Sequence, residues 1–171
     1  STFWQTMAIV LLFTIVGGIF AAAETALITL RDSQVKKLAA TGRRGRRLEK
    51  LMLDPNRFLG AVQVGVTLAG FLSAGYGASK IVPIFSPQLV SWGLSQSAAE
   101  TLSFIAATVL IAYMSLVVGE LTPKRLAIQH AERYALLLVT PVDFIAKITA
   151  PFIWLLSKSS DALLRILGGD P

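Results

Sequence analysis

Residues 3–23 read FWQTMAIVLLFTIVGGIFAAA and carry no formal charge. A helix rises 1.5 Å per residue, so about 20 residues of this kind cross the ~30 Å hydrocarbon core of a bilayer. The stretch is longer than the apolar core of a signal peptide, and it runs into a charged segment without a cleavage-type break. It therefore predicts a first membrane-spanning helix, with a signal peptide as the alternative.

Two further apolar stretches lie at residues 58–79 and 101–121. The first of them, FLGAVQVGVTLAGFLSAGYGAS, is rich in glycine and alanine, which let helix backbones approach closely. The second, TLSFIAATVLIAYMSLVVGEL, is followed closely by Pro123, which predicts a break or kink. Between the two stretches, Pro83 and Pro87 predict a capped loop at the membrane interface.

The composition agrees with a membrane protein. Of the 171 residues, 54% are hydrophobic and 15% are charged, whereas about a quarter of an average soluble domain is charged. The length fits one domain, so we assign residues 1–171 to a single all-α integral membrane domain. Without cysteine, thiolate metal sites are excluded, and the lone His130 has no partner for a zinc set. We expect no enzymatic activity, because neither a nucleophile with a base partner nor a P-loop is visible.

The formal net charge of +6 comes largely from the connector at residues 31–57, which contains RRGRR at residues 43–47. By the positive-inside rule this connector is cytoplasmic. The N-terminus then lies outside the cell and the C-terminus inside, in the plasma membrane. No stacking aromatics interleave the arginines, so we expect contact with the anionic cytoplasmic leaflet and not with nucleic acid.

The tail at residues 134–167 is apolar enough to resemble a fourth span. Asp143 and Lys147 would then lie near the middle of the membrane, where ionisable groups are costly. Pro141 and Pro151 would interrupt the helix. We therefore predict broken juxtamembrane helices on the cytoplasmic leaflet, with a full fourth span as the alternative. The expected fold is three transmembrane helices, interrupted near the functional site, plus interfacial helices.

Two carboxylates lie at the ends of predicted spans. Glu24 ends the first span and Glu120 ends the third. Ionisable groups in a membrane span are candidate functional groups, and two carboxylates favour a cation site. Beside Glu120, Gly119 permits close backbone approach, and Pro123 leaves the Gly119 carbonyl without its usual i+4 donor. Such hard oxygen ligands suit Mg²⁺ or Ca²⁺. For Glu24 the alternative is a helix cap or an ion pair with a nearby base.

Polar side chains in the second and third spans extend this candidate site. Gln63 and Thr67 lie one turn apart in the second span, with Ser73 further along, and Ser115 precedes Glu120 in the third. Each is also explained by an interhelical hydrogen bond worth about 1 kcal/mol, or for Ser115 by a bond to its own helix. Together they indicate a polar cavity.

Three stretches in this order, AAAETALITLR at 21–31, LGAVQVGVTLAGFLSAGYGA at 59–78 and SLVVGELTPKRLAI at 115–128, resemble the transmembrane domain of the CorC/CNNM (cyclin M) magnesium transporters. The resemblance covers nearly the whole chain. It implies a homodimer of three-span subunits with juxtamembrane helices that moves Mg²⁺ by Na⁺-coupled export. It also implies a cytoplasmic CBS-domain pair that binds ATP. That module is missing here and would follow Pro171, after the linker-like residues 168–171.

The resemblance also implies a Mg²⁺ site between a break in the first span, the polar face of the second and the glutamate of the third. Carried over, the ligands are Gln63, Thr67, Gly119 and Glu120, together with the break at residues 21–24. Where many members of the family have serine before the ETAL-like motif, this chain has three alanines. A ligand from that turn, for which we take Ala22, is therefore a backbone carbonyl.

The leading functional hypothesis is membrane transport of Mg²⁺. One alternative is a membrane scaffold whose polar groups only join helices and which docks a cytoplasmic partner. Another is a transporter for a different divalent cation or a small organic cation. We also expect a C2 dimer that forms through small residues of the second and third spans, because three spans leave little room to enclose a cavity.

Overall fold

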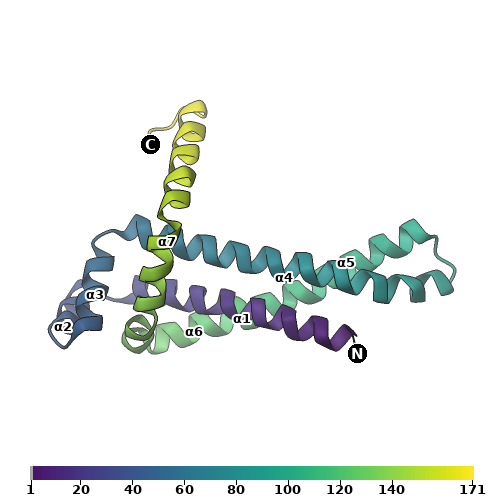
Figure 1. The fold of residues 1–171 in the computed structure, drawn as a ribbon, viewed down its shortest axis with the longest axis horizontal. Helices are drawn as coiled ribbons and strands as arrows, with labels where there is room; N and C mark the ends of the chain where they lie inside the picture. Colours follow the sequence, from purple (N-terminus) through teal and green to yellow (C-terminus); the bar gives the residue numbers. More distant parts are fainter. Residues whose placement is uncertain (1) are drawn as a thin grey trace.

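The computed structural model describes residues 2–171, and these residues form helices joined by short turns (Figure 1). No strand occurs among them, so the prediction of an all-helical protein is confirmed. In chain order the elements are α1 (Thr2–Thr29), α2 (Asp32–Ala39), α3 (Arg43–Met52), α4 (Pro55–Ser91), α5 (Gln96–Leu116), the π-helical turn η1 (Val117–Leu121), α6 (Thr122–Gln129) and α7 (Ala131–Ile166).

Helices α1, α4 and α5 run lengthwise beside one another, with α4 packed on both of the others (Figure 1). Small residues set the spacing between α1 and α4. A Cβ added at Gly17 would lie 3.2 Å from the Cβ of Ala69, and one at Gly65 would meet the ring of Phe20. Because these residues contact each other across two helices of the same chain, they let α1 pack closely on α4, and α1 lies in the middle of the bundle.

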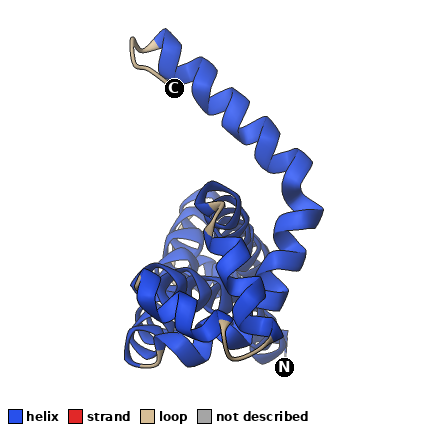
Figure 2. Cartoon of the chain, turned by 90° about the vertical axis from the view of Figure 1, so that its left-hand side faces the viewer, coloured by secondary structure: helices blue, strands red, loops and turns tan. Residues whose placement is uncertain are grey.

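Four helical stretches in the described chain are long and apolar enough to cross a membrane, judged by length and composition. They are Phe3–Thr29, Pro55–Ser91, Gln96–Gln129 and Ala131–Ile166. The first three contain the predicted spans, and the fourth contains the tail predicted to be interfacial. Figures 1 and 2 show that α7 crosses the bundle near one end and then leaves it, instead of running alongside the long helices. The count of three spans therefore stays a prediction.

The predicted interfacial loop after the second span is wrong, because α4 continues through Pro83 and Pro87 to Ser91. Packing outweighs the local effect of the prolines. Ile81 is fully buried, and the ring of Phe85 stacks on Phe3 with centroids 5.8 Å apart. Both proline side chains are exposed, so they do not disturb the packed side of the helix.

Two other predicted breaks are also absent. The first span is one continuous helix through residues 21–24, where the three alanines are buried and favour helix. The tail, predicted as broken helices, is the single helix α7, with Pro141 and Pro151 exposed inside it. Burial of Val139 and Val142 holds the helix together around the first proline.

The basic connector forms a helical hairpin of α2 and α3. Its apolar side chains, Val35, Leu38, Leu48 and Leu51, are buried in the same core as Leu27 of α1. The two helices cross where Gly45 lies against the backbone of Leu38 and Ala39, so a Cβ at Gly45 would overlap the Leu38 carbonyl. The hairpin therefore requires glycine at this position.

We expect Gly45→Ala to open the hairpin, because a backbone clash is not relieved by a rotamer change and overpacking costs about 1–3 kcal/mol. Limited trypsin digestion measures this through the cleavage rate at Arg43, Arg44, Arg46 and Arg47. The control is Gly42→Ala, since Gly42 has open space around it and extended backbone that any residue adopts. Equal cleavage of the Gly45→Ala protein and the parent would contradict the packing described here.

Candidate functional site

The third long helix changes its hydrogen-bond register at η1. The N–H of Thr122 donates to the carbonyl of Val117, five residues back, and not to that of Val118. The next residue, Pro123, has no N–H. The helical ladder therefore offers no donor to the Val118 carbonyl in either register. A π turn of this kind is often found at functional sites, and it provides the interruption that the sequence predicted near Glu120.

Glycines bring α1 and η1 into close contact. A Cβ at Gly18 would lie 3.0 Å from Cγ of Pro123 and 3.1 Å from the carbonyl oxygen of Val118. A Cβ at Gly119 would lie 3.2 Å from Cγ2 of Thr14 and 3.3 Å from its carbonyl oxygen. The two backbones thus approach each other as closely as glycine allows.

A small cavity lies beside this contact, among α1, α4, α5 and η1, with a volume of about 40 Å³. Its oxygen-bearing side chains are Thr14, Ser115 and Glu120. A volume near 10–15 Å³ is enough for one water molecule, so the cavity has room for a few waters or for a small ion that has lost part of its hydration shell. The other lining residues are Phe13, Gly17, Val66, Ala69, Gly70 and Gly119.

The cavity adjoins a more open groove of about 520 Å³ along α4 and α5. Ser115 and Glu120 line both spaces, and Thr67 and Thr108 line the groove. The carboxylate of Glu120, which is half-buried, therefore stands between the small cavity and the more open groove.

Thr14 is a member of the site that sequence reasoning missed. Its side chain is buried, and its Oγ1 donates to the carbonyl of Val10 at 2.8 Å and lies 3.3 Å from Oγ of Ser73. The signal was present, because Thr14 is a polar residue in an apolar span, like Gln63 and Thr67 in the second. Ser73 itself is buried and bonded to α1, and it lines neither the cavity nor the groove.

The structure brings some of the predicted residues together and leaves others apart. Gly119, Glu120 and Ser115 meet at the cavity, and Thr67 is on the adjoining groove. The amide Nε2 of Gln63 donates to Oγ1 of Thr67 at 3.0 Å, but Gln63 is exposed and lines neither space.

The remaining predicted residues lie further along α1. Ala22 lines a separate apolar groove of about 430 Å³ between α1, α6 and α7. Glu24 is half-buried and lines neither the cavity nor the groove. Within residues 2–171, no three His, Asp or Glu side chains cluster as metal ligands usually do. The candidate site therefore combines one carboxylate with neutral oxygens.

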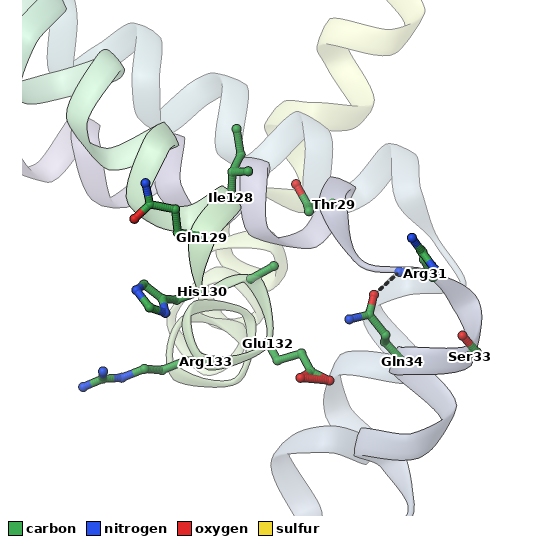
Figure 3. A pocket seen from close by; sticks show the side chains of 10 residues that line it. Thr29, Arg31, Ser33, Gln34, Ile128, Gln129, His130, Glu132 and Arg133 are labelled. Atoms are coloured by element: carbon green, nitrogen blue, oxygen red, sulfur yellow. Dashed lines mark hydrogen bonds between the residues drawn. The ribbon is translucent and has the colours of Figure 1, made fainter.

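A polar pocket of about 730 Å³ lies at the end of the bundle, where the turn between α1 and α2 faces the turn between α6 and α7 (Figure 3). In Figure 3, His130 and Arg133 point away from α2, whereas Glu132 points toward it. Oε1 of Gln34 accepts a hydrogen bond from the Arg31 N–H at 2.9 Å. Because side chains of both signs line this pocket, it does not concentrate charge as the Glu120 site does.

The fold and this site define a multi-pass helical membrane domain with a carboxylate in its apolar bundle. Residues 7–171 match the family described as cyclin M transmembrane N-terminal domain, and the chain belongs to this CNNM family.

Relatives of known sequence agree with this assignment. The chain is 37% identical over 160 residues to UPF0053 protein sll0260 of Synechocystis sp., covering 93% of this chain and 36% of the relative. It is 35% identical over 150 residues to UPF0053 protein YhdP of Bacillus subtilis, covering 87% and 34%. It is also 28% identical over 164 residues to the polyamine export protein of Haemophilus influenzae, covering 95% and 38%. The chain thus spans little more than a third of these relatives.

The cavity predicts a difference in chemical accessibility between two serines of α5. We expect Ser115→Cys to react with a charged, membrane-impermeant methanethiosulfonate reagent at least about tenfold faster than Ser103→Cys, because an apolar environment disfavours the thiolate. Ser115 lines the cavity and the groove, whereas Ser103 is 1% exposed. The chain has no cysteine, so each variant carries a single thiol. Equally slow modification at both positions would mean that water does not reach the cavity.

Proposed function

We propose that this domain transports a divalent cation, Mg²⁺, with Glu120 as its charged ligand. The observation that carries the proposal is the position of this carboxylate, at a π turn beside a small cavity lined with hydroxyl groups inside an apolar bundle. Mg²⁺ prefers oxygen ligands at 2.0–2.1 Å and usually keeps several waters, and a cavity of about 40 Å³ is compact enough to favour such an ion.

Electrostatics explain why the carboxylate is needed. A divalent ion that leaves water for a low-dielectric bundle loses hydration energy that neutral oxygens replace only in part. Glu120 is the one formal charge in residues 101–121. The hydroxyl groups of Thr14 and Ser115 are the neutral side-chain oxygens that line the cavity with Glu120. The Val118 carbonyl, which lacks a ladder donor, lies against Gly18 on the side of the apolar groove.

The membrane topology is part of the proposal. We place the hairpin of α2 and α3 in the cytoplasm and α7 on the cytoplasmic leaflet of the plasma membrane, with the N-terminus outside. Two features support this arrangement: the arginines of the hairpin, and the transverse course of α7 at the same end of the bundle (Figure 1). Na⁺-coupled export, and regulation through an ATP-binding CBS module in the whole protein, are carried over from the family.

A homodimer would complete the assembly. Gly65 and Ala69, two small residues of the second span, pack against α1 and leave little surface for a partner. Gly75 has open space around it, and Phe71, one turn before it, is 72% exposed. An outer face of α4 with small and apolar residues suits close helix packing against a second copy.

Glu120→Gln tests the proposal, since it keeps the shape of the side chain and removes its charge. We expect the Mg²⁺ affinity, measured by calorimetry on the purified protein, to fall about 100-fold, which is ~2.8 kcal/mol. The matched control is Glu24→Gln, for which we expect a much smaller change because Glu24 does not line the cavity.

Flux in proteoliposomes provides the second readout for the same pair of variants. We expect Mg²⁺ flux through the parent to increase when an opposing Na⁺ gradient is applied, and to be lost in Glu120→Gln. If the parent shows no saturable Mg²⁺ binding and no flux, the scaffold alternative is favoured. Binding and flux of Glu120→Gln equal to the parent would assign the carboxylate a structural role.

Export of an organic polycation is a second candidate, favoured by the similarity to the polyamine export protein of Haemophilus influenzae. The open groove of about 520 Å³ has room for an extended amine beside Glu120, whereas the 40 Å³ cavity does not.

Competition separates the two cargoes. If Mg²⁺ occupies the small cavity, Mn²⁺ and Co²⁺ should displace it, because they suit the same oxygen ligands. A linear polyamine such as spermidine should leave the measured Mg²⁺ affinity unchanged. Displacement by spermidine and not by Mn²⁺ or Co²⁺ would instead assign the groove to an organic cation.

A further inference from the structure

A second cleft, remote from the Glu120 cavity, lies between α3, the start of α4 and α7, with a volume of about 480 Å³. Six basic side chains line it and only two carboxylates do. The basic residues are Arg43, Arg46, Arg47, Lys50, Arg57 and Lys147, and the acidic ones are Asp54 and Asp143. The cleft therefore has a strong excess of positive charge that the proposed transport site does not use.

Few of these charges are neutralised within the described chain. Nζ of Lys147 lies 3.2 Å from Oδ2 of Asp143, and the other five basic residues form no ion pair in residues 2–171. Arg47 Nη1 donates to Oγ1 of Thr140 at 3.3 Å, which connects α3 to α7 beside the cleft. Nε of Arg57 is buried without a hydrogen-bond partner. A buried donor without an acceptor is unfavourable, so an anionic oxygen in the cleft would stabilise the fold.

Exposed apolar side chains stand next to this basic cleft. Leu53, Phe144 and Ile148 are 80%, 61% and 59% exposed, and each is adjacent in the sequence to a lining residue, Asp54, Asp143 or Lys147. A soluble phosphate would use only the basic side chains. A phospholipid has an anionic headgroup joined to acyl chains and would use both kinds of surface.

We propose that this cleft binds the phosphate of an anionic phospholipid, with the acyl chains along the exposed apolar side chains of α7. Arginines supply several N–H donors in a fixed geometry that matches phosphate oxygens. The lipid would hold α7 against α3 at the membrane surface. This inference does not depend on which cation the domain transports.

The test is native mass spectrometry of the delipidated protein with equal amounts of phosphatidylglycerol and phosphatidylcholine. The variant Arg43→Gln/Arg46→Gln/Lys50→Gln removes three exposed charges from the cleft. The control Lys36→Gln/Lys37→Gln/Arg44→Gln removes three exposed charges from the same hairpin outside it. We expect the parent and the control to retain phosphatidylglycerol and the cleft variant to bind it about tenfold less or weaker still. Phosphatidylcholine should show no such difference.

A second arm separates the sources of phosphate. Inorganic phosphate in large excess should not displace phosphatidylglycerol if the acyl chains contribute to binding. If phosphate alone binds in the cleft and displaces the lipid, the site belongs to a soluble phosphate and the lipid assignment fails. Equal loss of phosphatidylglycerol in both triple variants would show that the attraction is diffuse, which would overturn the cleft as a site.

Discussion

The close contact between α1 and the π turn η1 determines how the rest of the bundle is arranged. Gly18 lies against Val118 and Pro123, and Gly119 lies against Thr14, so a larger side chain at either glycine would push the helices apart. The contact with Gly119 places Thr14 beside the segment that carries Glu120, and α1 packs on α4 at the same level. The cavity lies beside the place where the backbones of α1 and η1 meet, because the side chains around this contact do not fill all of the space.

The sequence was sufficient to predict the long apolar helices, because hydrophobicity over about 20 residues is a property of each segment alone. It also predicted the interruption near Pro123, where a missing donor coincides with a glycine. The prediction from sequence failed where packing between segments that are distant in the chain determines the local structure. Pro83 and Pro87 remain in one helix because Phe85 and Ile81 pack on other parts of the fold, and no local pattern contains that information.

The same distinction explains the outcome at the candidate site. Glu120 was found because a carboxylate is unusual in a membrane span, and Gly119 because it lies beside Glu120 and four residues before Pro123; the structure places both at the cavity. Gln63 was selected by the same reasoning, but its face of α4 is directed outward. Helical spacing shows which residues share a face and does not show which neighbour that face meets. Thr14 stands out in the sequence as a polar residue in an apolar span, but its contact with Gly119, far along the chain, follows from the packing of α1 on η1.

The distribution of charge places opposite demands on two parts of the molecule. The Glu120 carboxylate inside the bundle attracts cations, whereas the uncompensated arginines of α3 repel them from the end where α3 and α7 meet. The like charges of α3, which lie three or four residues apart along the helix, also repel one another and destabilise it. An anionic headgroup in the basic cleft would reduce both effects. The membrane surface would then supply the anionic partners that most basic side chains of the cleft lack within residues 2–171. The stability of the hairpin of α2 and α3 would therefore depend on the charge of the surrounding lipids.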